Sequence, residues 1–105
     1  MKMDLEQVNT ICMEMISNAG EGRALVYEAL EAVIAKEYAA AEAKLTEAEG
    51  YLAQAHRIQF EQLMAPQNNG TELPFSMLLL HAMDLTMVST SEHDMLRSIV
   101  KAHIN

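Results

Sequence analysis

The chain has 105 residues, a formal net charge of −8, and a composition that is 50% hydrophobic but only 5% aromatic. This length suits one domain, and we expect residues 1–105 to form it. The acidic balance excludes a nucleic-acid partner, since no basic patch is present to neutralise a phosphate backbone. No apolar run approaches the length of a membrane span, no signal peptide precedes the single cysteine, and no internal disulfide can form. We therefore expect a cytoplasmic protein without direct membrane insertion.

The first helical pattern covers residues 4–36, where apolar residues recur at steps of three and four. Its stripe consists of Leu5, Val8, Cys12, Met15, Ala19, Gly22, Val26, Leu30 and Val33. Residues 17–22 resemble a helix break, but the stripe keeps its phase through them. We therefore predict one continuous helix, in which Gly22 admits a close neighbour on the buried side, with a turn at 17–22 as the alternative. We interpret Cys12 as a small buried hydrophobe and not as a nucleophile.

The second pattern covers residues 38–64 and is rich in alanine, so its partners can approach closely. Its stripe consists of Ala41, Leu45, Ala48, Leu52, Ala55, Gln59 and Leu63. Residues 65–70 follow with the sequence APQNNG, which is typical of a loop.

The third pattern covers residues 74–103, and Pro74 suits its first helical turn. One stripe consists of Leu78, His81, Leu85, Val88, Met95, Ile99 and Ala102, and a second of Leu79, Leu80, Met83 and Met87. Two apolar faces on one helix exceed what a three-helix monomer can bury. We predict an all-α fold, an antiparallel up-down-up bundle of three long helices that self-associates through the third helix as a dimer or trimer.

His81 and Asp84 stand three residues apart on this apolar helix, so they share one part of its surface. Three uses fit the pair: a histidine nucleophile, a metal site, or structural groups satisfied by hydrogen bonds. A di-iron bundle is excluded, because it needs Glu three residues before its histidines, and no histidine in this chain has one. His56 and Gln59 share a face of the second helix, where structural hydrogen bonding is the favoured role. We expect the other two histidines, His93 and His103, to be exposed.

Three blocks in order make the chain resemble the lactose/cellobiose-type IIA components of the bacterial sugar phosphotransferase system. The first block is ISNAG at residues 16–20 followed by RALVYEAL at 23–30. The second lies within residues 47–59 and ends in AHRIQ, and the third is SMLLLHAMD at 76–84. Together the blocks span nearly the whole chain.

The resemblance implies a homotrimer of three-helix subunits, with the third helices around the threefold axis. It implies that His81 is the catalytic residue, which accepts a phosphoryl group from phospho-HPr and passes it to a cysteine of a cognate IIB component. It also implies that Asp84 meets its symmetry mates on the axis. A divalent cation is the expected cofactor there, and Mg²⁺ is the favoured ion. Three converging carboxylates repel one another, so they must protonate or bind a hard cation.

The chain departs from the family pattern beside the histidine, where the family usually reads His-Ala-Gln-Asp-His. Met83 stands in place of the glutamine and Leu85 in place of the second histidine. Both changes remove polar groups from the neighbourhood of His81. They leave a second hypothesis open: a trimeric helical interaction or regulatory protein, derived from such a carrier, that no longer transfers phosphate.

Overall fold

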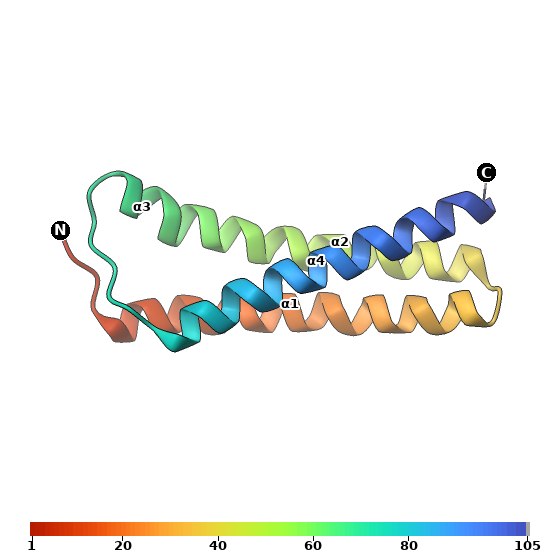
Figure 1. Ribbon diagram of the computed structural model, residues 1–105, viewed down its shortest axis with the longest axis horizontal. Helices are drawn as coiled ribbons and strands as arrows, with labels where there is room; N and C mark the ends of the chain where they lie inside the picture. The colour runs from red at the N-terminus through yellow and green to blue at the C-terminus, as the bar shows by residue number, and fades with distance from the viewer. Residues whose placement is uncertain (105) are drawn as a thin grey trace.

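The computed structural model describes residues 1–104 and has three helical arms in an up-down-up arrangement (Figure 1). Helix α1 spans Leu5–Ile34. The second arm runs through α2 (Tyr38–Gln59), the π-helical turn η1 (Phe60–Met64) and α3 (Ala65–Asn68). The third arm is α4, which spans Met77–Ile104 and lies across the α1–α2 pair. The bundle is a rod about 52 Å long, and the predicted all-α architecture of three long helices is confirmed.

Helix α1 is continuous through residues 17–22, as the phase of its apolar stripe predicts. Asp4 caps its start, because its carboxylate accepts from the Gln7 N–H at 2.8 Å while the Gln7 side chain accepts from the Asp4 N–H at 2.9 Å. Its end is a Schellman turn, in which the Glu37 N–H reaches the Ala32 oxygen and Lys36 takes a φ of 62°. Gly22 is buried against the second arm, and a Cβ there would lie 2.8 Å from the Leu52 side chain.

The second arm contains one extra residue within its helical path, taken up by the π turn η1. The Ala65 N–H bonds to the Phe60 oxygen, five residues back. The core therefore steps from Ile58 directly to Leu63, a spacing of five that a regular helix would not keep on one face. The predicted stripe had Gln59 in place of Ile58, because a single π turn leaves no periodic signal in the sequence.

The connection before α4 lies later in the chain than predicted, at residues 69–76. Residues 65–68 are helical, so the predicted loop at 65–70 is correct only at its end, where Gly70 has a φ of 97°. Helix α4 begins at Met77 and not at Pro74, because the Ser76 hydroxyl accepts from the Leu79 N–H and donates to Asn9 on α1 at 2.7 Å. A parallel bridge between Lys2 and Glu72 joins the N-terminal segment to this loop.

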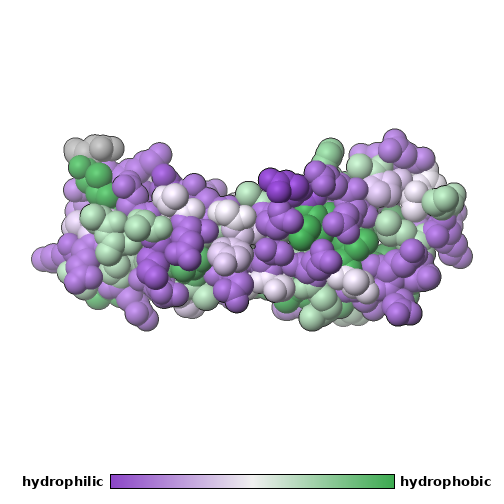
Figure 2. All heavy atoms as spheres, turned by 180° about the vertical axis from the view of Figure 1, so that it is seen from behind, coloured by the Kyte–Doolittle hydropathy of each residue, from purple (hydrophilic) through white to green (hydrophobic). Residues whose placement is uncertain are grey.

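The core consists of two hydrophobic clusters along the rod. One joins the C-terminal half of α1 to α2 and the end of α4, and the other joins the start of α1 to Ile58, Leu63 and Ala82. The face of the rod behind α4 is mostly hydrophilic, with scattered hydrophobic side chains (Figure 2). Among residues 1–104, no helix is both long and apolar enough to cross a membrane.

Candidate functional site

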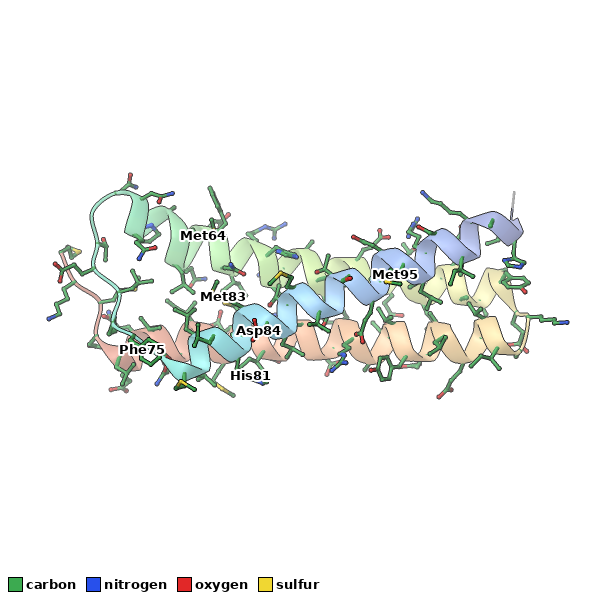
Figure 3. All side chains as sticks on the ribbon, viewed as in Figure 1. Met64, Phe75, His81, Met83, Asp84 and Met95 are labelled. Atoms are coloured by element: carbon green, nitrogen blue, oxygen red, sulfur yellow. The ribbon has the colours of Figure 1, made fainter. Side chains whose placement is uncertain are left out.

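His81 and Asp84 both lie on the exposed part of α4, within its N-terminal half (Figure 3). The side chains that α4 buries are Ala82, Thr86, Ser89, His93, Leu96 and Val100, which recur at steps of three and four. His81 and Asp84 fall outside this stripe, so within one chain neither is a core residue. Of the three uses considered for the pair, burial as structural groups in the core of the chain is therefore excluded.

The inward and outward faces of α4 have an unusual distribution of polarity. The inward face carries three polar groups, Thr86, Ser89 and His93, among its six buried residues. The outward face carries large apolar side chains, including Met77, Met87 and Met95, which are 70%, 63% and 69% exposed. A soluble helix ordinarily has the opposite arrangement, so the outward face has the character of a buried surface.

The outward face has the spacing of a coiled-coil seam. Its exposed residues recur at steps of three and four: Met77, Leu80, Asp84, Met87, Ser91, Met95, Ser98 and Ala102. Met77, Asp84, Ser91 and Ser98 stand at intervals of seven residues, but three of the four are polar. The large apolar side chains of this face are Met77, Leu80, Met87 and Met95. Asp84 occupies one of the central positions of this face.

The two edges of α4 are identified by its contacts with the other helices. Glu92 forms a bidentate ion pair with Arg23 of α1, at 2.8 and 3.0 Å, and so marks the α1 edge. His81 and Val88 share that edge, since they precede Glu92 by eleven and four residues. Their exposed neighbours Met95 and Ile99 continue it as an apolar groove against Tyr27 and Leu30 of α1.

The opposite edge faces the second arm. Thr90 lies 2.9 Å from the His56 ring, and Arg97 pairs with Glu49. Met83 precedes these two residues by seven and fourteen positions, so it lies on the same edge. Figure 3 shows His81 and Met83 projecting from opposite sides of α4, with Asp84 between them.

The prediction that His93 is exposed is wrong. His93 is only 4% exposed and clamps α4 to α2. Its Nε2 lies 3.1 Å from both the Leu45 backbone oxygen and a Glu49 carboxylate oxygen of α2. Its Nδ1 lies 2.9 Å from Oδ1 of the neighbouring Asp94. Its spacing of seven from Thr86 and four from Ser89 places His93 on the same stripe, but a stripe of three polar residues lacks the hydrophobic signal that predicts an inward face.

His56 and His103 have structural contacts on the surface. The Thr90 hydroxyl donates to the Thr86 oxygen at 2.8 Å, so it can only accept from His56 Nε2. His56 thus contacts the edge of α4 opposite His81, in the structural role predicted for it, and the Gln59 side chain makes a long contact to the Met64 sulfur. His103 is exposed, as predicted, and stacks on the Tyr38 ring at 4.3 Å.

Cys12 is fully buried in α1, which confirms its interpretation as a small hydrophobe. Burial raises the pKa of its thiol, so the reactive thiolate is disfavoured at neutral pH. Residues 1–104 contain no group of three or more His, Cys, Asp or Glu side chains placed to hold a metal within one chain. Asp84 supplies one carboxylate, so a metal site at this residue requires ligands from other copies.

The sequence and the fold were compared with those of known proteins. Residues 10–104 match the model of the lactose/cellobiose-specific IIA subunit family of the phosphotransferase system. The chain belongs to this family. It is 29% identical over 99 residues to the lactose-specific EIIA component of Staphylococcus aureus strain N315, covering 94% of this chain and 95% of the relative. It is 27% identical over 100 residues to the N,N'-diacetylchitobiose-specific EIIA component of Escherichia coli K12, covering 95% and 85%.

Solved structures of IIA proteins have the same fold. The crystal structure of PtcA from S. mutans superposes with a TM-score of 0.92 at 30% identity, covering 98% of this chain and all of that one. Solution structures of a chitobiose IIA in complex with HPr give a TM-score of 0.74 at 26% identity, covering 96% and 94%. The resemblance inferred from the three sequence blocks is thereby confirmed. The lactose/cellobiose IIA chain described here places SMLLLHAMD at the start of α4.

Proposed function

We propose that this IIA component is a phosphoryl carrier in sugar uptake, in which His81 is the group that carries the phosphoryl. The observation that supports this role is the position of His81, an exposed imidazole on the α1 edge of α4, within the segment that resembles the family's active site. A carrier histidine must be open to two successive partners, and an exposed ring meets that requirement. His93 is buried and His56 donates to Thr90, so His81 is the favoured acceptor over both.

The chemistry at His81 is a pair of substitutions at phosphorus. An imidazole nitrogen is nucleophilic near neutral pH. It attacks the phosphorus of phospho-HPr, so that a new P–N bond forms on His81 as the P–N bond to HPr breaks. A thiolate of the cognate IIB component then attacks the same phosphorus and releases the His81 imidazole. The relative solved in complex with HPr supports HPr as the donor.

The outward face of α4 supports assembly as a homotrimer. Its central line carries Leu80, Met87 and Met95, and apolar residues also flank this line on both edges, with Met83 on one side and Val88 and Ile99 on the other. Apolar residues beyond the two seam positions favour a bundle of more than two helices. In a trimer with three parallel α4 helices on the axis, the seam and its flanks become buried together.

Asp84 would bring three carboxylates to that axis. Carboxylate oxygens are the donors that Mg²⁺ and Ca²⁺ prefer, so the donor set fits a hard divalent cation. A bound cation would neutralise the repulsion among the three charges. Asp84 is then a structural ligand, and His81 carries the chemistry without it.

Phosphorylation in a reconstituted system tests the proposal. Incubation with phosphoenolpyruvate, enzyme I and HPr should add one acid-labile phosphoryl group per chain, measured by intact-mass spectrometry. His81→Ala should abolish this gain while circular dichroism keeps its helical signal. His56→Ala is the matched control, and should slow labelling at most.

The alternative function, a trimeric interaction or regulatory protein without phosphotransfer, rests on Met83 and Leu85. Met83 is partly exposed and Leu85 half-buried, and neither can donate a hydrogen bond to phosphoryl oxygens. Absence of labelling with HPr proteins from several related bacteria would favour this alternative. Labelling gained by the double variant Met83→Gln, Leu85→His would then identify the lost polar groups as the cause.

A further inference from the structure

We infer that Asn9 and Ser76 are positioning residues for His81, because their hydrogen bond fixes the first turn of α4 to α1; this rests on the carrier role in the proposed function. The Ser76 hydroxyl donates to the Asn9 side-chain oxygen at 2.7 Å. The same hydroxyl accepts from the Leu79 N–H at 3.2 Å. One small side chain therefore both caps α4 and ties it to the neighbouring helix.

This tie is shielded from solvent and has no polar substitute nearby. Ser76 is only 5% exposed. In the described part of the chain, no other side-chain hydrogen bond joins residues 74–84 to another helix, and the next polar contact between α4 and α1 is the ion pair of Glu92 with Arg23. Phe75, which precedes the cap, is 75% exposed, so it adds little packing at the start of α4.

His81 lies close to the tied end of α4. It follows Ser76 by five residues, or about 7.5 Å along the axis, and precedes Glu92 by eleven, or about 16 Å. The helical pattern pairs its N–H with the Met77 oxygen in the first turn. Helix ends open unless their free N–H groups are capped, and an opening of this turn breaks the hydrogen bond that holds His81 in the helix.

The residue type at position 9 agrees with this role. Asparagine is less favourable than alanine inside a helix, because its side chain competes for the hydrogen bonds of the backbone. Asn9 nevertheless stands in the second turn of α1, where it is half-buried. The hydrogen bond that it accepts from Ser76 accounts for an asparagine at this place.

The tie would act on the rate of phosphoryl transfer. Transfer requires the imidazole nitrogen to be aligned with the phosphorus and its leaving group when the partner protein docks. A first turn that opens part of the time presents His81 correctly in a smaller fraction of encounters. Asn9 and Ser76 touch none of the reacting atoms and act through the backbone of α4.

Hydrogen exchange tests the mechanical part without phosphotransfer. The His81 amide should exchange about fivefold faster in Ser76→Ala, as expected for loss of a helix cap, and faster than wild type in Asn9→Ala. Asn9→Asp keeps an acceptor oxygen and should exchange close to wild type. Gly22→Ala disturbs the α1–α2 contact and leaves the start of α4 intact, so it is the control for a general loss of stability. Unchanged exchange in both alanine variants would overturn the inference.

Single-turnover transfer from phospho-HPr tests the functional part. Asn9→Ala should lower the maximal rate severalfold, while the HPr concentration that gives half of this rate stays near that of wild type. Asn9→Asp should restore the rate, and Gly22→Ala should transfer at nearly the wild-type rate. A wild-type rate in Asn9→Ala, or a loss that Asn9→Asp does not restore, would refute the positioning role and leave the carrier role standing. A wild-type chain that takes no label would remove the carrier role, and the positioning role with it.

Discussion

At the scale of single residues, two glycines in helices have opposite physical roles. Gly22 is buried, and a Cβ there would lie 2.8 Å from both Cγ and Cδ2 of Leu52 and 3.4 Å from the Ala48 oxygen. Gly50 is exposed, and a Cβ there would meet nothing within 4 Å. Close packing between α1 and α2 therefore requires glycine at position 22, whereas Gly50 only weakens its helix.

We predict that Gly50→Ala raises the free energy of unfolding by about 1 kcal/mol through helix propensity alone. The same change at Gly22 should lower it by roughly 1 to 2 kcal/mol, because overpacking the α1–α2 contact outweighs that gain. Urea unfolding at one protein concentration measures both variants. An increase in stability for Gly22→Ala would contradict the close approach described here.

At the scale of helices, sequence periodicity predicted the elements better than the faces. All three helices and the continuity of α1 follow from steps of three and four, because any helix with a preferred side produces them. For α4 two apolar stripes were predicted, with the apolar surface left over from the bundle assigned to self-association. The inward side is instead a third stripe, with Thr86, Ser89 and His93 among small and apolar residues. Hydrophobic spacing reports burial in the final assembly, and cannot distinguish a neighbour in the same chain from one in another.

The site was predictable to a similar extent. The setting of His81 and Asp84 in an apolar helix left a role in the core open, and only the family resemblance implied a position for Asp84 outside the core of its own chain. The π turn at Phe60–Met64 leaves no periodic signal in the sequence. For His93 only the spacing from Thr86 and Ser89 pointed inward, and its partners on α2 are remote in sequence.

The His93 clamp gives a prediction at this scale. His93→Ala removes a buried ring that bridges α4 to the Leu45 oxygen and Glu49 of α2, so it should lower the free energy of unfolding by roughly 2 to 3 kcal/mol. His103→Ala is the matched control at the exposed end of α4, and should cost less than about 1 kcal/mol. Chemical unfolding of both variants provides the measurement, and equal losses would argue against the clamp.

At the scale of the whole molecule, stability should depend on what happens at the proposed axis. Three Asp84 carboxylates meeting there repel one another, and leucine at that position extends the apolar seam between Leu80 and Met87. We predict that Asp84→Leu stabilises the trimer by about 1 to 4 kcal/mol in the presence of EDTA. Thermal unfolding with sedimentation equilibrium tests this.

A matched control separates the axis from general charge effects. Glu21→Leu removes a carboxylate from an exposed position of α1, and should change the thermal midpoint little. If Asp84→Leu instead melts earlier than wild type without metal, the three carboxylates do not converge. A wild-type midpoint that rises with added Mg²⁺, and an Asp84→Leu midpoint that does not, would support a cation at the axis.

Helix α1 begins at one end of the rod and α4 ends at the other (Figure 1), and this determines where a tag can be attached. His81 is 23 residues before Ile104, or about 35 Å along α4. Three parallel copies would present all their C-terminal ends on one side, remote from the histidines. A tag or biosensor tether attached after α4 should therefore leave the phosphoryl-carrying end free in solution, whereas one attached before Met1 would sit beside the loop that leads into the site.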